Sequence, residues 1–116
     1  MFFDAAMLDA GDVAWVELDP VLGTEQAGRR PALVLSTRSY HEVSARAVVC
    51  PITSQARPWP FNVIIPQHLA VDGVILVDQI RTLHRPSRIF DVIGRLPDEV
   101  VGEVRDVLAA LTGMSG

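Results

Sequence analysis

Arginine is the residue type with the most capacity for chemistry in this sequence, and it is concentrated in the middle of the chain. All ten basic residues are arginines, and residues 29–88 hold eight of them against three acids. The flanking segments, 1–28 and 89–116, carry net charges of −6 and −3. A guanidinium group binds phosphate through two parallel hydrogen bonds, so the basic middle is compatible with one polyanion-binding face. The lack of lysine is also what a GC-rich genome produces.

Three segments of this basic region combine charged and polar side chains at turn positions. The first, residues 22–31, is a polar loop that ends in Arg29, Arg30 and Pro31. A residue before proline favours an extended backbone, which directs the two arginines to opposite sides, so only one is expected to face a site. The second, residues 51–55, follows an apolar run and ends in hydroxyl and amide side chains.

The third segment, residues 78–88, holds three arginines and one histidine. Between the second and third segments, Arg57 lies two residues before Trp59, a combination suited to stacking on an unpaired base. Each of these segments, taken alone, is also typical of a solvated loop or of a strand end. Composition therefore identifies candidate RNA-contacting residues but assigns no reaction.

Short apolar runs separated by turn residues predict the elements that must position these side chains. We expect about six strands, over residues 13–18, 32–36, 46–50, 61–65, 73–83 and 90–96. From Pro97 the apolar period becomes helical and ends at Gly113. No helix of crossover length separates the strands, so the pattern favours a small antiparallel β-barrel with a C-terminal helix over a parallel α/β sheet.

The length and composition exclude several classes of protein. A chain of 116 residues that is 49% apolar and 21% charged, with a mean hydropathy of +0.28, is expected to form a single domain over residues 1–116. Its apolar runs are far shorter than the ~18–20 residues that cross a bilayer. The start does not resemble a secretory signal, so we expect a cytoplasmic location. The single Cys50 excludes an intramolecular disulfide and is expected to pack in the barrel, and no zinc-site spacing is present.

An ordered set of motifs in this chain resembles the MazF/PemK toxins of bacterial toxin–antitoxin systems. The resemblance covers about residues 11–112, and its motifs are GDVAWVELDP (11–20), GTEQAGRRPALVLS (23–36), CPITSQ (50–55), PF (60–61) and VDQIR (77–81). It implies an SH3-like barrel with added helices, a homodimer, and an endoribonuclease that cuts single-stranded RNA at short sequences without a metal or other cofactor. It also implies a cognate antitoxin whose acidic segment occupies the RNA groove.

The resemblance places the family's functional arginine at Arg30, its functional threonine at Thr53 and its loop acid at Glu25. Cleavage by attack of the 2′-hydroxyl requires a base, stabilisation of the phosphate charge and protonation of the leaving oxygen. We expect Arg30 to clamp the phosphate, Thr53 to donate to a non-bridging oxygen and Glu25 to act as the base. The candidate RNA-binding residues are Gln26, Arg29, Ser54, Gln55, Arg57, Trp59, Gln79, Arg81 and Arg85.

Two alternatives remain open at this point. A non-enzymatic toxin of the same fold, like the CcdB proteins that trap DNA gyrase, would share the scaffold without the chemistry. A degenerate toxin would keep antitoxin binding and lose cleavage. The set of Glu25, Arg30 and Thr53 favours the nuclease. The histidines do not support a two-histidine mechanism, because nothing in the spacing pairs His84 with a second one.

Overall fold

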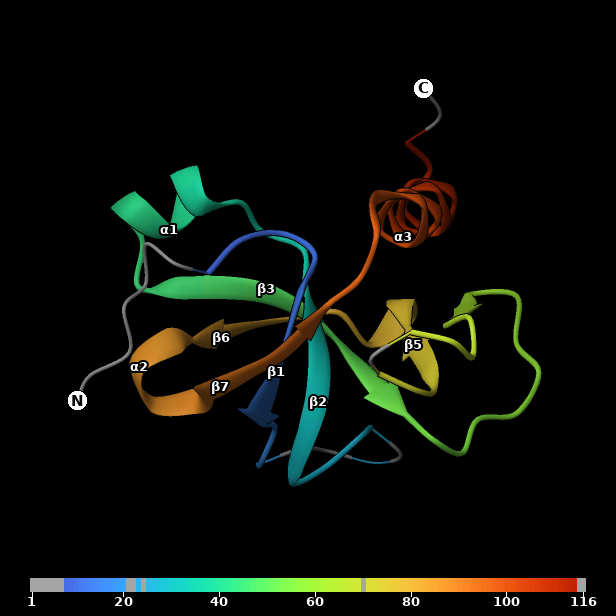
Figure 1. Cartoon of the computed structure of the whole chain (residues 1–116), viewed down its shortest axis with the longest axis horizontal. Coiled ribbons are helices and arrows are strands. Elements are labelled where there is room, and N and C mark those ends of the chain that lie inside the picture. The colour runs from blue at the N-terminus through green and yellow to red at the C-terminus, as the bar shows by residue number, and fades with distance from the viewer. Residues whose placement is uncertain (1–7, 21–22, 24, 70, 115–116) are drawn as a thin grey trace.

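The structure, a computed structural model, describes residues 8–20, 23, 25–69 and 71–114 and is dominated by one antiparallel sheet (Figure 1). Along the sheet the strands run in the order β4-β5-β3-β2-β1-β7, and β6 pairs with β3 beside this path. The strand bounds are β1 Asp12–Glu17, β2 Arg29–Val34, β3 Arg46–Thr53, β4 Asn62–Ile64, β5 Val74–Leu76, β6 Arg81–His84 and β7 Ile89–Arg95.

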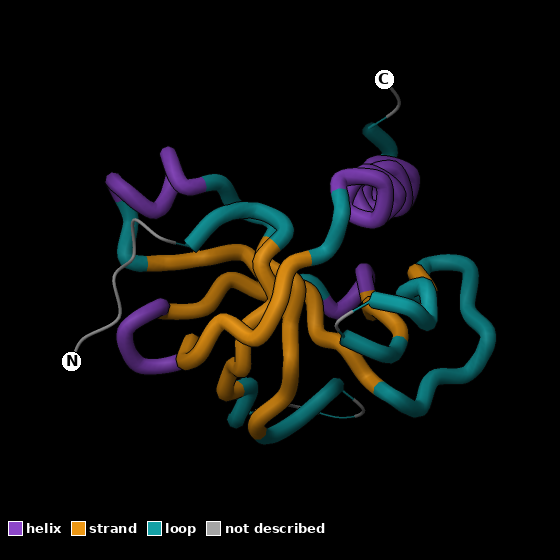
Figure 2. Tube along the Cα trace, viewed as in Figure 1, coloured by secondary structure: helices purple, strands orange, loops and turns teal. Residues whose placement is uncertain are grey.

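Three α-helices and a 3₁₀ turn over Val77–Gln79 complete the described fold. Figure 2 shows these helical segments in purple among the orange strands. Along the longest axis, the short helices α1 (Arg38–Val43) and α2 (Arg85–Arg88) lie toward one end, and the C-terminal helix α3 (Asp98–Thr112) lies toward the other, with β5 (Figure 1). None of the helices in the described ranges is both long and apolar enough to span a membrane. The mainly β architecture with a C-terminal helix confirms the predicted fold class.

The barrel is loose, because the sheet is not closed by a continuous ladder of strand pairs. β6 pairs with β3, whereas β7 pairs with β1, and the four-residue helix α2 joins β6 to β7. Register shifts interrupt the pairing of β1 with β7 at Val13, Ala14 and Val16. Such bulges bend a strand and increase its twist, which is how a small sheet curls around its own core.

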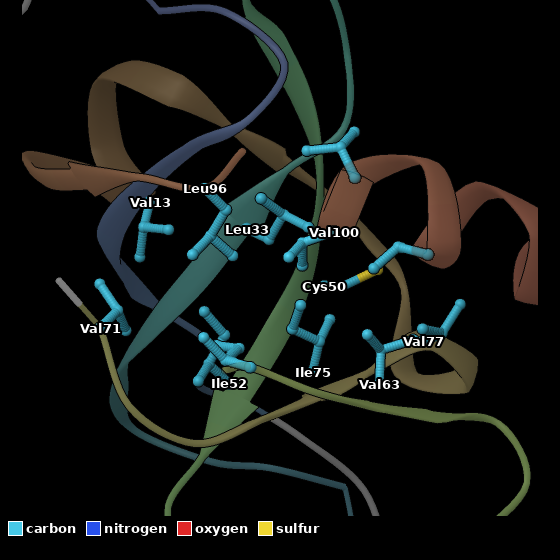
Figure 3. Close-up of a cluster of buried hydrophobic side chains, with 13 residues drawn as sticks. Val13, Leu33, Cys50, Ile52, Val63, Val71, Ile75, Val77, Leu96 and Val100 are labelled. Atoms are coloured by element: carbon cyan, nitrogen blue, oxygen red, sulfur yellow. The ribbon is translucent and has the colours of Figure 1, made fainter. Parts of the chain in front are cut away.

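Two apolar clusters form the core, one on each side of the curled sheet. The larger contains Val13, Leu33, Cys50 and Ile52 together with the inner side of α3 (Figure 3). From α3 come Val100, Val101 and Val104, whose spacing is the helical stripe predicted from the sequence. The smaller cluster gathers apolar residues that alternate along the strands with those of the larger one and so lie on the other face: Leu8, Ala14, Val16, Leu18, Ala32, Val34, Ala47, Val49, Leu83 and Ile89.

Helix α3 begins and ends close to the predicted residues. Pro97 is its N-cap, and Asp98 and Glu99 lie in the first turn, where carboxylates interact favourably with the helix dipole. The chain leaves the helix at Gly113, which adopts the left-handed conformation with φ of +76°.

The third strand is longer than predicted and continues through Pro51. On one edge, Pro51 is the partner of Ala32 in β2. On the other edge, residues 46–49 of β3 pair with β6 and residues 52–53 pair with β5. Pro51 therefore lies where one edge changes partner, and this is a place in a sheet where a missing amide hydrogen is tolerated.

The predicted single strand over 73–83 is wrong, because it is two strands separated by a 3₁₀ turn over Val77–Gln79. Ile75 pairs with Ile52, and Arg81 pairs with Val49. Three steps along β3 thus correspond to six along this segment, so three residues are in excess and form the turn. The segments expected to be loops around 38–43 and 85–88 are the short helices α1 and α2, too short to show a periodic stripe.

A first prediction concerns Gly73, which lies just before β5 with φ of +130°. A Cβ at this position would lie 2.6 Å from the carbonyl oxygen of Thr53. We expect Gly73→Ala to lower the free energy of unfolding by about 1–3 kcal/mol, since both the backbone angle and the contact are unfavourable. In contrast, Gly102→Ala in α3, whose Cβ would meet nothing within 4 Å, is expected to raise it by about 0.5–1 kcal/mol. Urea unfolding of both variants tests this, and equal stabilities would contradict it.

Candidate functional site: a polar cleft at the end of strand β3

A cleft of about 680 Å³ opens where β3 ends. Its walls come from three parts of the chain: the end of β3 with the following loop, the 3₁₀ turn, and the loop between β1 and β2. The lining residues are Gln26, Thr53, Gln55, Ala56, Arg57, Pro58, Trp59, Asn62, Leu76, Asp78 and Gln79. Five of the residues predicted to bind RNA and one of those predicted to be catalytic lie among these. The structure therefore brings together side chains that are separated by more than fifty positions in the sequence.

Thr53 is the last residue of β3, and its side chain is buried at the floor of the cleft. Its hydroxyl donates to the carbonyl oxygen of Gln55 and accepts from the Gln55 amide, both at 3.2 Å. The strand pairing of Thr53 with Val74 fixes the backbone on the other edge. The hydroxyl is therefore held in one place by a tight turn, and Ser54 and Gln55 follow it at the exposed rim.

The 3₁₀ turn presents Asp78 and Gln79 to the cleft. These two residues belong to the three extra residues between β5 and β6, so the register offset is what brings them out of the sheet. The side-chain oxygen of Gln79 accepts a hydrogen bond from the backbone amide of Gln26 at 2.8 Å. This contact joins the turn to the loop between β1 and β2.

Trp59 forms an exposed aromatic wall of the cleft. Its indole is 52% exposed, and Nε1 donates to Oδ2 of Asp78 at 3.0 Å. The ring packs edge-on against Phe61, with 5.5 Å between the ring centroids. The side chain predicted to stack on an unpaired base is therefore outside the core and fixed at one edge.

Arg30 and Arg29 serve different surfaces, as their adjacent positions in β2 require. Arg29 lies over the ring of Phe90 at 4.2 Å, on the surface next to Trp15. Arg30 is exposed, and its Nε donates to the carbonyl oxygen of Ala27 at 3.2 Å.

The strand register relates Arg30 to Thr53. Ala32 pairs with Pro51, two residues short of Arg30 on one strand and of Thr53 on the other. The same register, extended by two residues along each strand, would place Arg30 opposite Thr53 on the same face of the sheet. Glu25 is exposed in the loop that precedes β2.

Two arginines predicted to contact RNA are engaged with backbone carbonyls. Arg81 donates from Nη1 to Leu18 at 2.6 Å. Arg85 is 4% exposed and donates to the carbonyl oxygens of His41, Ser44 and Arg46 at the end of α1. Burial lowers the pKa of Arg85 because the cation loses hydration. The side chain of Arg85 is thus not presented to a groove, in contrast to the expectation from the charge cluster.

Cys50 is not a nucleophile in this structure. It lies in the larger core cluster, as predicted, and burial, together with the charge of Asp78, raises the pKa of its thiol to about 12. A thiol with this pKa stays protonated at neutral pH and is inert. In the described part of the chain, no three His, Cys, Asp or Glu side chains gather as a metal-binding group would require.

Two polar cleft residues, Asp78 and Asn62, were not predicted as site residues. Asn62 donates from Nδ2 to the carbonyl oxygen of Arg57 at 3.1 Å, which fixes the loop that carries Trp59. Asp78 stands at the start of the basic segment, where the arginines dominate the pattern. Asp78 lies in the cleft because the segment from β5 to β6 is three residues too long for its pairing with β3. This excess can be recognised only once the strand pairing is known.

The described fold is that of small β-rich toxins with an exposed polar cleft, and solved structures confirm the likeness. A crystal structure of MazF from Deinococcus radiodurans matches with a TM-score of 0.86 and 45% identity, covering 92% of this chain and 97% of that one. MazF in a MazE–MazF complex from the same organism matches with a TM-score of 0.81 and 43% identity, covering 93% and 98%.

The chain belongs to the family of PemK-like, MazF-like toxins of type II toxin–antitoxin systems, whose model matches residues 9–112. It is 41% identical over 75 residues to the endoribonuclease toxin MazF of Escherichia coli K12, covering 65% of this chain and 67% of the relative. It is 36% identical over 107 residues to the endoribonuclease EndoA of Bacillus subtilis, covering 84% and 88%. The predicted family is therefore confirmed.

A second prediction follows from the burial of Arg85. We expect Arg85→Ala to lower the free energy of unfolding by about 1–3 kcal/mol, because it leaves buried carbonyl oxygens without a donor. Arg105→Ala, at an exposed position on α3, removes the same charge and serves as the matched control. Urea unfolding measures both. If Arg85→Ala had wild-type stability but bound RNA more weakly, the prediction would be wrong and Arg85 would be an RNA-binding residue of the groove.

Proposed function

We propose that this chain is the toxin of a type II toxin–antitoxin system and acts as a sequence-specific endoribonuclease on single-stranded RNA, inhibiting translation and growth. The observation that carries the proposal is the arrangement at the end of β3. There the Thr53 hydroxyl lies in a polar cleft with an aromatic wall, and the β2–β3 register, extended two residues beyond the pair of Ala32 with Pro51, would bring Arg30 opposite Thr53. Family membership and relatives named as endoribonucleases support the same reaction.

The reaction needs no group beyond the side chains of the protein and the RNA itself. The 2′-oxygen of the ribose attacks the adjacent phosphorus while the bond from phosphorus to the 5′ oxygen breaks, which leaves a cyclic phosphate and a free 5′-hydroxyl. Glu25 takes the proton of the 2′-hydroxyl, and the leaving oxygen takes a proton from solvent. Arg30 and the Thr53 hydroxyl stabilise the negative charge that builds up on the non-bridging oxygens.

The cleft supplies the contacts that select the RNA. Trp59 offers a half-exposed ring on which an unpaired base can stack. Gln26, Gln55 and Gln79 offer amides for base edges, with Ser54 at the rim, and Arg57 offers a cation for a phosphate. Arg29 lies on the other face of β2, where it would meet a more distant part of the strand. A single-stranded substrate fits this cleft because its bases are free to turn outward.

The proposed partners follow from the relatives and from surface chemistry. MazF from D. radiodurans is solved in complex with MazE, so we propose a cognate antitoxin that covers the RNA site of this chain. We also propose a homodimer, supported by the exposed apolar side chains of Trp15, Val92 and Ile93 on β1 and β7. A toxin that acts on cellular RNA works in the cytoplasm. The CcdB-like alternative is not favoured, because the relatives are named endoribonucleases.

A third prediction tests the activity itself. Purified protein is incubated in EDTA with a long single-stranded RNA and with DNA of the same sequence, and the cut ends are mapped. We expect cleavage of RNA alone at one recurrent short sequence, and a loss on the order of 10²–10³-fold for Arg30→Ala, as for removal of a donor to a transition-state oxyanion. Arg105→Ala is the charge-matched control. Intact RNA from folded wild-type protein would exclude the nuclease and favour a protein target.

A fourth prediction tests Glu25 as the base. We expect Glu25→Gln to keep RNA binding and to lower kcat by roughly 10²–10⁴-fold, since the amide cannot accept the proton of the 2′-hydroxyl. The measurement is kcat against pH for wild type and variant under saturating RNA. Near-normal cleavage by the glutamine variant across the pH range would remove Glu25 from this role.

A further inference from the structure

Two arginines from the stretch that comprises β6 and α2 reach the end of β1 with their side chains. Arg81, the first residue of β6, donates from Nη1 to the carbonyl oxygen of Leu18 at 2.6 Å. Arg88, the last residue of α2, donates from Nη1 to the carbonyl oxygen of Asp19. The two arginines therefore bind the carbonyl oxygens of two consecutive residues, Leu18 and Asp19.

These carbonyls stand at the entrance to the loop between β1 and β2. The ends of this loop are joined to each other, because the Leu18 amide donates to the carbonyl of Gly28 at 2.9 Å and the Gly28 amide donates to Oδ1 of Asp19 at 3.0 Å. On the far side, the Gln26 amide donates to the Gln79 side chain at 2.8 Å. The same segment of chain, 79–88, therefore holds the loop at its entrance and near its exit.

The contacts replace backbone pairing that the sheet does not provide. β6 is hydrogen-bonded to β3, and β1 is hydrogen-bonded to β2 and β7, so a side chain is what links β6 to the end of β1. Arg81 is half-buried, and a guanidinium bond to a carbonyl is stronger than a neutral one. An arginine side chain suits this contact, because it is long enough to reach from β6 to the Leu18 carbonyl and its guanidinium has further N–H donors.

We propose that Arg81, supported by Arg88, is a positioning residue that fixes the loop carrying Glu25 and leading into Arg30 for RNA cleavage. It acts through the carbonyl of Leu18 and not as a ligand of an RNA phosphate. The inference rests on the proposed ribonuclease function and goes beyond it by separating the arginines that touch RNA from those that hold the loop. Arg81 and Arg57 carry the same charge, but Arg57 lines the cleft and Arg81 does not.

The two roles predict different kinetics. A phosphate ligand contributes to binding, and its loss reduces the salt dependence of affinity by about 0.7 in the slope of log K against log salt for single-stranded RNA. A positioning residue leaves that slope unchanged and affects the chemical step, because displacement of catalytic groups by about 1 Å can cost on the order of 100-fold in rate. The ratio of the effects on kcat and KM therefore distinguishes them.

The experiment compares wild type, Arg81→Ala, Arg81→Lys and the charge-matched control Arg105→Ala. Steady-state cleavage gives kcat and KM, RNA binding at several salt concentrations gives the slope, and hydrogen exchange reports the Gln26 and Gly28 amides. For Arg81→Ala we expect kcat to fall about 10–100-fold with little change in KM, an unchanged salt slope and faster exchange of both amides. Arg81→Lys, which keeps a donor on a flexible stem, should recover at least fivefold of the lost kcat.

Two results would overturn the inference. One is a reduced salt slope with kcat preserved in Arg81→Ala, which would make Arg81 a phosphate ligand. The other is unchanged exchange of the Gln26 and Gly28 amides in Arg81→Ala, or, where the alanine variant does not fold, a reduced kcat of Arg81→Lys without faster exchange of these amides. The lysine variant retains the charge and most of the side chain, so it decides the question if the alanine variant does not fold. The exchange measurement needs no RNA, so inactive wild-type protein would contradict the proposed function while leaving Arg81 tested.

Discussion

The hydrogen bonding of β3 along both of its edges is the constraint on which the rest of the structure depends. On one edge β3 pairs with β2, and on the other it pairs first with β6 and then with β5. Because β5 and β6 come from one stretch of chain, their two registers with β3 must be reconciled, and three residues are extruded as a turn. That turn supplies Asp78 and Gln79 to the cleft, beside Thr53 at the end of β3. The cleft is thus a consequence of how one strand is paired.

Arginine has two distinct uses in this molecule, and burial separates them. Arg81, Arg85 and Arg88 donate to backbone carbonyls, at sites where strands or short helices end and the carbonyls lack partners of their own. Arg30 and Arg57 are exposed at or near the cleft. A cation bound to carbonyls needs no acidic partner nearby, which is how a strongly basic segment can fold without a matching acidic one. The charge available to an anion is therefore smaller than the sequence count indicates.

The positions of most strands and the C-terminal helix could be predicted because each has a local signal, whereas Thr53 was identified through the resemblance of its motif to the MazF/PemK toxins. Alternating apolar residues mark strands, helical spacing marks α3, and the break after Pro51 and Ile52 marks the strand end. The division of 73–83 could not be predicted, since it arises from the register with β3 and leaves no trace in local periodicity. The burial of Arg85 was missed for a related reason. A charge cluster in the sequence shows how many cations are present, but the carbonyls that accept Arg85 belong to His41, Ser44 and Arg46, about forty residues away.

The wall of the cleft is organised before any ligand arrives, and this limits how it can recognise one. The indole N–H of Trp59 is already bonded to Asp78, so the polar edge of the ring is not available to a base. The edge-on packing of the Trp59 ring against Phe61 fixes the tilt of the indole. What remains for recognition is the exposed face, which stacks on any base and favours an unpaired one over a particular sequence. In the proposed ribonuclease, the amides of Gln26, Gln55 and Gln79 would then discriminate between bases. The Gln79 side chain already accepts a hydrogen bond from the Gln26 backbone amide. A shift of the loop between β1 and β2 would therefore also move the Gln79 side chain that lines the cleft.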